Sequence, residues 1–414
     1  MQSANPVLPA RAFVPEALLP PRQAIVAYFS RVTVAPPRVE RVELDDALGR
    51  VLAEPIVADD DYPNAPRSLM DGFALCARDA PGALRIAGEV RMGATDAPAA
   101  TASAVRIPTG GVLPHDADAV VPFEDVRVQD GVIIIEVAVK PGDNVAPRGA
   151  DMPRGETVLT ARRRIRAPEI GVLATLGITA VPVYRRPLVA VISSGDELVE
   201  PGARPAAGQI RDSNRYAIAA SLRAMGADAH HYPTLRDETK EFESALRDAI
   251  RECDAVVVSG GSSVGDRDRL PQAVAAIARP GVVIHGLRVK PGKPTLFGAH
   301  DGKPILGLPG NPTSALMMLE AVAAPIVAAL VGSPVEATVV SAHLAEPARS
   351  RRGWTWYVPV RLQDDAGGPL AHPLPLRSFS VSVTARADGY VVMNEDDEQL
   401  AAGTPVVVHR FLGG

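Results

Sequence analysis

The chain has 414 residues, of which 47 % are apolar, and a formal net charge of −5. This length allows two to four domains of about 100–200 residues each, and the charge gives no basic footprint for nucleic acid. Its two cysteines, Cys76 and Cys253, form no CxxC pair, and the histidines show neither HxxxH nor HExxH spacing, so we expect a reduced cytoplasm and no zinc site. The longest apolar run, residues 315–331, contains Glu320 and Pro325. Because this run is interrupted, we expect no membrane span. Because the amino terminus shows no secretory signal, we expect no export.

The amino-terminal part is predicted to be loop, then helix, then extended chain. Apolar residues at Ile25, Val26, Tyr28 and Phe29 have the spacing of one helix face. A second apolar-periodic run follows at residues 44–52.

Short strands dominate the next part of the chain. Residues 59–149 mix alternating apolar runs with Gly and Pro turns, as in GVIIIEVAV at residues 131–139. This pattern predicts a small β-rich domain, in which the alanine-rich residues 97–104 are a loop. Beyond it, residues 167–176 are predicted to be a helix that Gly177 ends.

From residue 185 the pattern becomes an alternation of strands and helices, which predicts a doubly wound, mostly parallel sheet. We expect Ser213 or Asn214 to cap one helix and Gly226 to end it. The expected strands are residues 188–193, 255–259 and 282–284, and the expected helices are residues 213–225, 239–252 and 270–278.

After Ser333 the apolar period returns to two, which predicts a small β-barrel. Trp354 and Trp356 share one face of a strand there, and we interpret them as core residues. The predicted domains are residues 1–58 with 150–186, residues 59–149, residues 187–332 and residues 333–414.

The predicted sheet ends in polar, glycine-rich loops at several of its strands. These loops read SSGDEL, LRDET, SGGSSVGDRD, VKPGKP and GLPGNPTS. In open α/β sheets ligands bind at the carboxyl ends of the strands, and the exposed amides of such loops hold anions such as phosphate. Crowded carboxylates beside phosphate-binding amides favour Mg²⁺, and the candidates are Asp196, Glu197, Asp237, Asp266 and Asp268.

Two common phosphate motifs are absent, and two further turns are ambiguous on their own. No GxxxxGK[ST] P-loop is present, and GGSSVG lacks the spacing of a dinucleotide-binding loop. The Met-Asp-Gly turn at Asp71 and the Thr-Gly-Gly turn at Thr109 are each typical of an ordinary turn. Thr109 and its neighbours also offer N–H groups and a hydroxyl to an oxyanion.

Eight motifs in order change this interpretation. They are LDDALGRVLAEPI, SLMDGFAL, IPTGGVLPHDADAVVPFED, GADMPRGETVL, ISSGDEL, SGGSSVGDRD, VKPGKP and LPGNPTSA. Together they resemble the molybdopterin molybdenumtransferase family (MoeA, similar to the E domain of gephyrin), from about Glu16 to the carboxyl terminus. The implied fold class is α/β multidomain, with a central doubly wound molybdopterin-binding α/β domain, small β-rich flanking domains and a C-terminal β-barrel.

The resemblance implies the last step of molybdenum cofactor synthesis. The family binds adenylylated molybdopterin and molybdate, cleaves the pyrophosphate link with Mg²⁺, and transfers molybdenum to the dithiolene sulfurs with release of AMP. It also implies a homodimer in which the segment that contains Asp71 faces the central domain of the other subunit. An adenylating partner protein is a further expectation.

The resemblance also implies the site residues, which follow the family motifs position by position. The residues expected to carry the reaction are Asp71, Thr109, Asp151, Glu197, Asp237 and Asp268, of which Glu197, Asp237 and Asp268 are the expected metal ligands. The residues expected to bind the substrate are Ser194, Gly195, Gly260, Gly261, Ser263, Gly265, Lys290, Lys293, Pro309, Gly310, Asn311 and Ser314.

This chain departs from the family pattern at four positions. Arg67 stands where many members have Asn, Gly111 replaces Ala, Ser194 replaces Thr, and Arg288 stands near a common lysine. Arg67 and Arg288 keep the site cationic, so we expect oxyanion binding to be retained. The preference for molybdate or tungstate stays open.

Three other functions remain as alternatives. A carrier or scaffold would bind molybdopterin without turnover, although the acidic set argues against it. An adenylyltransferase would need only the central domain and would depend on ATP. A nucleotide-cleaving hydrolase would release AMP without molybdate or pterin.

Overall fold

The computed structural model describes residues 17–93, 98–236, 239–261, 269–334, 338–377 and 380–412. The chain divides into two compact units. Residues 1–41, 49–51 and 182–414 form the first, here the main unit, and residues 42–48 and 52–181 form the second, here the small unit. Strands β1 (Val39–Glu43) and β12 (Ala180–Tyr184) pair with each other, and the boundary between the units passes through both.

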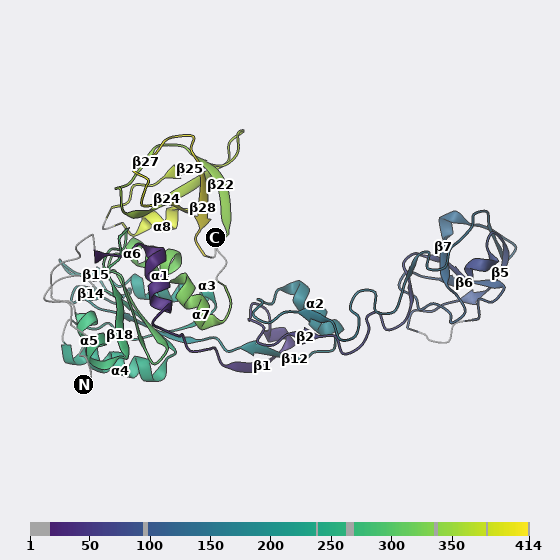
Figure 1. The fold of residues 1–414 in the computed structure, drawn as a ribbon, viewed down its shortest axis with the longest axis horizontal. Helices are drawn as coiled ribbons and strands as arrows, with labels where there is room; N and C mark the ends of the chain where they lie inside the picture. Colours follow the sequence, from purple (N-terminus) through teal and green to yellow (C-terminus); the bar gives the residue numbers. More distant parts are fainter. Residues whose placement is uncertain are drawn as a thin grey trace. The chain divides into compact units, whose positions relative to one another are not determined.

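The main unit is built on a six-stranded sheet with the order β16-β13-β17-β21-β20-β18 (Figure 1). The first four strands are parallel, and β20 and β18 run antiparallel to their neighbours. The predicted mostly parallel sheet is therefore confirmed. The strand bounds are β13 (Leu188–Ser193), β16 (Asp228–His231), β17 (Ala255–Ser259), β18 (Pro280–His285), β20 (Leu296–His300) and β21 (Lys303–Leu308).

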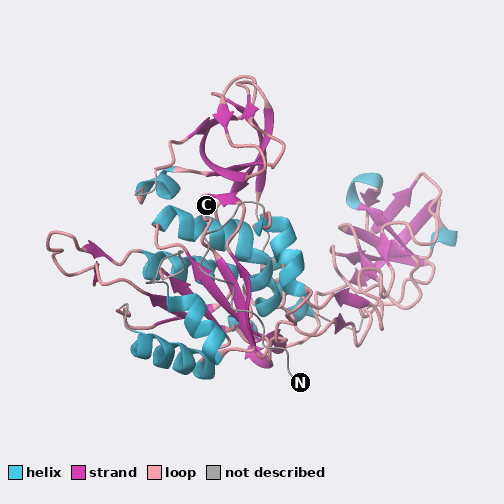
Figure 2. Cartoon of the chain, turned by 60° about the vertical axis from the view of Figure 1, so that its left-hand side comes forward, coloured by secondary structure: helices cyan, strands magenta, loops and turns pink. Residues whose placement is uncertain are grey.

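Helices cover both faces of this sheet, because successive strand residues point to opposite sides (Figure 2). Val191 and Val257 are buried with α1 (Pro21–Phe29) and α3 (Asn214–Met225). Ile192 and Val258 are buried on the opposite face, with α4 (Thr239–Glu252) and α5 (Arg269–Ile277). Helices α3, α4 and α5 and strands β13, β17 and β18 lie within a residue or two of the predicted bounds.

The predicted apolar face of α1 is wrong in part. Pro21, Ala24 and Tyr28 are buried, whereas Val26 is 71 % exposed and Phe29 is 39 % exposed. The helix contacts the sheet through Tyr28, whose hydroxyl donates to the carbonyl oxygen of Gly298 at 3.3 Å. The small side chain of Ala24 permits this close packing, which spacing of large apolar residues alone did not indicate.

One helix has the length and apolar composition of a membrane span, Pro312–Val331. It consists of α6 (Pro312–Met317), a π-helical segment (Met318–Ala323) and α7 (Ala324–Val331). Within the main unit 56 % of its apolar window is buried, and its residues pack into the same core as α3 and the sheet. It is therefore a core helix of this unit, because length and apolar composition alone are weak evidence for a membrane span.

The carboxyl-terminal segment forms the predicted barrel. Five strands close on themselves because β24 (Thr355–Gln363) pairs with both β25 (Leu370–Pro373) and β26 (Gly389–Met393). The short strand β19 (Val289–Lys290), from the loop after β18, lies parallel to β24. The remaining elements of this segment are β22 (Val339–Leu344), β23 (Ala348–Arg349), α8 (Ser382–Arg386), β27 (Gln399–Leu400) and β28 (Pro405–Arg410). Elsewhere in the main unit, β14 (Leu198–Val199) pairs with β15 (Ile210–Arg211).

The small unit is centred on another six-stranded sheet, with the order β7-β4-β6-β5-β9-β8. The strands of the small unit are β2 (Ile56–Val57), β3 (Arg67–Ser68), β4 (Gly72–Leu75), β5 (Gly82–Glu89), β6 (Ser103–Ile107), β7 (Ala119–Pro122), β8 (Arg127–Gln129), β9 (Val132–Ile135), β10 (Val145–Ala146) and β11 (Thr157–Leu159), with short 3₁₀ turns at Ala77–Asp79 and Phe123–Asp125. The apolar-periodic run noted at residues 44–52 forms one 3₁₀ turn, at residues 44–46.

Helix α2 (Ala167–Thr175) begins at a buried carboxylate. Glu169 is 3 % exposed, and its carboxylate accepts hydrogen bonds from the backbone N–H of Arg166 at 2.9 Å and from Nε of Arg163 at 2.8 Å. The side-chain hydrogen bond from Arg166, with these further bonds, lowers the pKa of Glu169 from 4.5 to about 2. The charged carboxylate therefore stabilises the folded state.

We expect Glu169→Gln to lower the free energy of unfolding of the small unit by about 2 kcal/mol at neutral pH. Because the folded-state pKa is depressed, this difference from the wild type is complete above pH 4.5 and disappears as the pH falls towards about 2. Urea unfolding of both proteins across this range measures it. A difference that does not change with pH would contradict the electrostatic explanation.

Candidate functional site

Three of the predicted binding loops meet at the carboxyl edge of the central sheet. They follow the adjacent strands β13, β17 and β21, and their backbones touch. The N–H of Ser194 donates to the carbonyl of Ser259 at 2.9 Å, and the N–H of Gly260 donates to the carbonyl of Leu308 at 3.1 Å. A Cβ on Gly310 would lie 3.7 Å from the Cα of Gly260. The described parts of these three loops therefore lie side by side, as expected for the ends of adjacent parallel strands.

Gly260 is required by this geometry. Its φ is +92°, and a Cβ at this position would lie 2.3 Å from the carbonyl oxygen of Ser194. We expect Gly260→Ala to separate the β13 and β17 loops and to lower the free energy of unfolding by about 2 kcal/mol. Gly310→Ala is the matched control, since its Cβ meets only an ordinary contact. Equal melting temperatures for the two variants would show that the close approach is unimportant.

Glu197 belongs to the same edge. Its side chain is exposed and folds back over Gly195, where a Cβ would lie 2.7 Å from Oε2 of Glu197. An exposed carboxylate beside backbone amides is a suitable oxygen ligand for Mg²⁺. Of the other predicted residues at this edge, Ser263, Gly265, Asp237 and Asp268 lie outside the described residues, so Glu197 is the one expected metal ligand that the described part of the chain contains. Among described residues, no group of three His, Cys, Asp or Glu side chains is placed to hold a metal ion.

A buried polar network supports these loops, and the sequence did not reveal it. Asp212 is 1 % exposed and accepts hydrogen bonds from the hydroxyl of Ser193 at 2.9 Å and from the backbone N–H of Arg215 at 3.1 Å. Nδ2 of Asn214 donates to the hydroxyl of Ser259 at 2.7 Å and to the carbonyl of Gly310 at 2.8 Å. The start of α3 therefore ties the ends of β13, β17 and β21 together.

The predicted position of the helix cap is confirmed, but the capping bond comes from this network. Ser213 occupies the N-cap position of α3 but makes no side-chain capping bond, and Asp212 supplies the acceptor for the N–H of Arg215 instead. Asn214 uses its amide on the neighbouring loops rather than on its own helix. The predicted end is confirmed, because Gly226 takes the left-handed conformation there.

The two predicted cationic residues lie on the loop after β18. Nζ of Lys290 is 4.3 Å from the ring centroid of Trp356, and Nζ of Lys293 is 5.9 Å from that of Trp354. Both tryptophans are half-buried, and Trp356 packs against the barrel core, as the sequence interpretation expected. They also form the surface on which the lysines lie, which was not expected.

The predicted residues Asn311, Ser314 and Pro309 flank the start of α6. Asn311 is the N-cap residue of this helix and makes no side-chain capping bond. Its half-buried side chain lies beside the Gly310 carbonyl that Asn214 holds.

The small unit brings two predicted residues into direct contact. Oδ1 of Asp71 accepts a hydrogen bond from the backbone N–H of Thr109 at 2.8 Å. Nη1 of Arg67 donates to the carbonyl of Gly110 at 2.8 Å, so this departure from the family pattern holds the Thr-Gly-Gly turn in place. A Cβ on Gly111 would lie 2.8 Å from Cγ1 of Ile107, and glycine fits this tight turn.

Asp151 lies on a different loop of the small unit. It is exposed, and its backbone N–H donates to the carbonyl of Tyr62 at 3.1 Å. Nearby, the backbone N–H of Arg154 donates to Asp61, and this bond, with Arg148, lowers the pKa of Asp61. Within the described residues no hydrogen bond or ion pair joins Asp151 to the Asp71–Thr109 pair. The predicted residues thus form one group in the main unit and others in the small unit.

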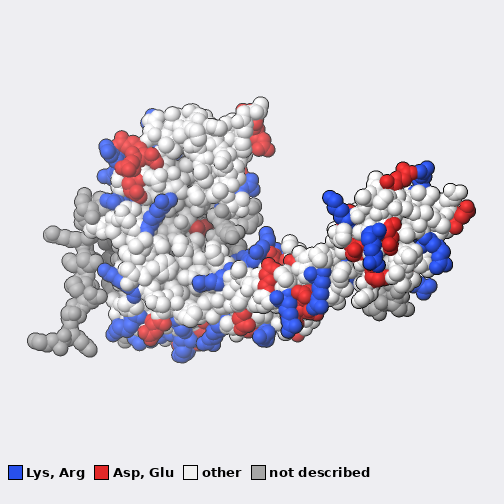
Figure 3. Space-filling model, turned by 45° about the vertical axis from the view of Figure 1, so that its right-hand side comes forward, with Lys and Arg blue, Asp and Glu red and all other residues white. Residues whose placement is uncertain are grey.

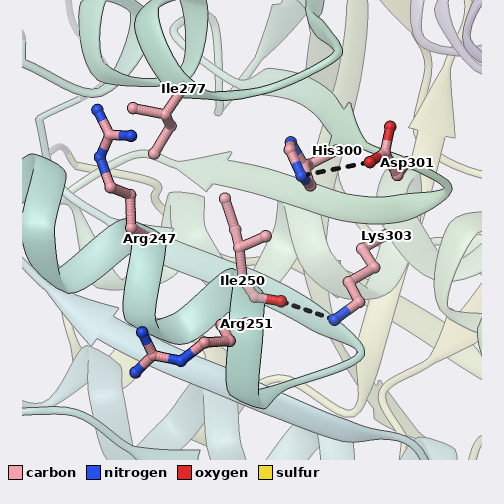
Figure 4. Close-up of a pocket in the computed structure, with 7 residues that line it drawn as sticks. All are labelled: Arg247, Ile250, Arg251, Ile277, His300, Asp301 and Lys303. Carbon is pink, nitrogen blue, oxygen red and sulfur yellow. Dashed lines mark hydrogen bonds and ion pairs between the residues drawn. The ribbon is translucent and has the colours of Figure 1, made fainter.

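A separate hollow of about 480 Å³ lies at the opposite edge of the central sheet (Figure 4). It is bounded by α4, α5 and the turn between β20 and β21, and it contains none of the predicted site residues. Its basic side chains have partners within the protein. Nζ of Lys303 donates to the carbonyl of Ile250 at 2.7 Å, and Arg251 pairs with Asp248 at 2.9 Å. This hollow therefore lacks the chemistry expected of the site.

Charges of both signs alternate on the face that Figure 3 shows, in keeping with the net charge of −5. The described part of that face has no extended basic surface of the kind that binds nucleic acid.

The mostly parallel sheet, with glycine-rich loops at the carboxyl ends of its strands, is typical of an α/β domain that binds its ligand at that edge. Residues 190–329 match the sequence model of the probable molybdopterin binding domain. Residues 19–177 match the MoeA N-terminal region (domain I and II), and residues 341–411 match the MoeA C-terminal region (domain IV). The chain therefore belongs to the MoeA family, and the resemblance seen in its motifs is confirmed.

Individual relatives and solved structures also match this chain over most of its length. The molybdopterin molybdenumtransferase of Synechocystis sp. is 32 % identical over 375 residues, covering 87 % of this chain and 92 % of that protein. The molybdopterin molybdenumtransferase of Haemophilus influenzae is 35 % identical over 303 residues, covering 72 % and 74 %. A molybdopterin biosynthesis MoeA protein from Pyrococcus horikoshii has a TM-score of 0.81 at 32 % identity, covering 96 % of this chain and all of its own. The predicted α/β multidomain fold class is thereby confirmed.

Proposed function

We propose that the chain inserts molybdenum from molybdate into adenylylated molybdopterin, with Mg²⁺-dependent cleavage that releases AMP and yields molybdenum cofactor. The observation that supports this most directly is the junction of the β13, β17 and β21 loops. It lies in the segment that matches a molybdopterin binding domain, and it brings the Gly260–Gly261 turn and the start of α6 to the same edge of the sheet as the carboxylate of Glu197. Relatives that cover most of the chain are named for this transfer.

The residues of the junction suit a phosphate-bearing substrate. Gly260 and Gly261 have φ values of +92° and +61°, so the chain turns sharply after β17. The N–H of Gly260 donates to the carbonyl of Leu308, and we assign the N–H of Gly261 to the phosphate. Gly310 and Asn311, at the start of α6, adjoin this turn. Lys290 and Lys293 would neutralise charge that develops on the pyrophosphate link as it breaks.

Mg²⁺ would be held by Glu197, Asp237 and Asp268, where it supplies positive charge to the phosphate oxygens. Glu197 would fix the ion on the β13 loop, where its charge would act on the phosphate oxygens of the substrate. Within the small unit, Asp71 holds the backbone of Thr109, so we assign Thr109 to the molybdate end and Asp71 chiefly to its support. Asp151 is assigned to the reaction by the family resemblance.

The proposal includes a cytoplasmic homodimer whose site uses residues of both subunits, and a possible adenylating partner. Mixing a protein that bears Asp71→Ala, which removes the acceptor for the Thr109 N–H, with one that bears Glu197→Gln tests the shared site. If it is shared, the mixture recovers part of the activity that each variant lacks, because mixed dimers contain one intact site. No recovery after subunit exchange, shown by differently tagged copies, would place all residues of a site in one subunit.

The decisive experiment measures AMP released from adenylylated molybdopterin by the purified chain with Mg²⁺, with and without molybdate. Release that depends on molybdate and reactivates an apo-molybdoenzyme supports the transferase. Tight binding without release would favour the carrier, and release indifferent to molybdate would favour the hydrolase. Formation of adenylylated molybdopterin from ATP and molybdopterin would instead identify an adenylyltransferase.

A further inference from the structure

The two tryptophans of the chain both face the lysines assigned to the phosphate. Trp354 and Trp356 are the only indoles in the sequence, and both come from the carboxyl-terminal barrel. The ammonium of Lys290 lies 4.3 Å from the ring centroid of Trp356, well inside the range of a cation–π contact. Lys293 and Trp354, at 5.9 Å, are at the limit of that range.

The backbone fixes the closer pair. Strand β19 runs parallel to β24, and Lys290 is the register partner of Trp356. The Trp356 ring packs against the barrel core, and its indole N–H is buried with no acceptor among the described residues. Packing, rather than a hydrogen bond to the ring nitrogen, therefore sets the orientation of the indole. A fixed ring beside a flexible lysine restricts where the ammonium lies.

We propose that Trp356 is a positioning residue that holds the Lys290 ammonium for the phosphate of the substrate, and that Trp354 does the same more weakly for Lys293. This rests on the proposed function, since it assumes that these lysines bind the phosphates. A lysine side chain loses rotamer freedom when it is immobilised on a ligand. A ring that already confines the ammonium reduces this loss. The barrel thereby contributes to an anion site built on the central sheet.

Equilibrium binding of adenylylated molybdopterin to the full chain under anaerobic conditions tests this inference. We expect Trp356→Leu, which removes the π face, to raise Kd about three- to tenfold, and Trp356→Phe to restore most of the affinity. Trp354→Leu is expected to have the smaller effect because its lysine is farther from the ring. Val358→Ala is the structural control, since Val358 packs against the same barrel core and touches neither lysine in the described contacts.

A double-mutant cycle with Lys290→Gln shows whether Trp356 acts through the lysine. If it does, Trp356→Leu weakens binding in the wild type but adds nothing in the Lys290→Gln background. The inference would be overturned if Trp356→Leu raised Kd equally in the wild type and in the Lys290→Gln background. It would also be overturned if Val358→Ala raised Kd as much as Trp356→Leu does. Normal affinity in Lys290→Gln itself would overturn the lysine assignment in the proposed function. If Lys290→Gln raised Kd and Trp356→Leu left Kd unchanged, only the positioning role of Trp356 would be overturned.

Discussion

Glu197→Gln is expected to reduce AMP release from adenylylated molybdopterin at least about 100-fold while changing substrate affinity only a few-fold. The substitution keeps the size of the side chain that folds over Gly195 and removes the negative charge that would hold Mg²⁺. The N–H of Gly261 and the lysine ammonium groups remain to bind the phosphates. Single-turnover AMP release and equilibrium binding, measured at several Mg²⁺ concentrations, separate the two effects.

Asp228→Asn provides the control for charge. Asp228 is exposed on the same sheet, at the amino end of β16, and its loss changes the net charge equally. We expect normal turnover from this variant. If higher Mg²⁺ partly restores Glu197→Gln, the metal role is supported. A Glu197→Gln protein with unchanged AMP release would remove this residue from the mechanism.

The sequence predicted most elements of the main unit because their periodicity is local. The bounds of β13 and β17 and of helix α4 coincide with the expected residues 188–193, 255–259 and 239–252. The loop motifs were also sufficient to predict that residues far apart in the chain meet, because parallel strands place their carboxyl ends at one edge. The contact between Asp71 and Thr109 had no such rule behind it: the family resemblance named both residues but predicted no bond between them.

The supporting residues were missed for a physical reason. Asp212 and Arg215 stand in a polar stretch of sequence, IRDSNR, that is typical of an exposed loop and helix start. Their burial, at 1 % and 5 % exposed, results from mutual pairing within the fold, which no local pattern records. Trp354 and Trp356 were assigned to the core by their spacing, and that spacing says nothing about which side chains cover the rings.

The largest loss of stability is expected from Asp212→Ala. This substitution removes the buried carboxylate that faces Nε of Arg215 and accepts from the hydroxyl of Ser193. Arg215 keeps its exposed partner Glu200 and the carbonyl of Tyr232. Removing one partner of a buried charge pair costs about 3–5 kcal/mol. We expect the melting transition of the main unit to fall by about 10 °C, followed by circular dichroism or differential scanning calorimetry of the full chain.

Glu200→Gln tests the same arginine from its exposed side. Glu200 pairs with Nη2 of Arg215 at 2.6 Å, but its side chain is 59 % exposed, so its loss is expected to cost less than about 1 kcal/mol. The contrast isolates burial, since both substitutions remove one carboxylate from one guanidinium. If the two variants melted at the same temperature, Asp212 would be no more than a surface charge. If Asp212→Ala alone also weakened substrate binding, the network would be shown to hold the loops at the ends of β13, β17 and β21 in their binding geometry.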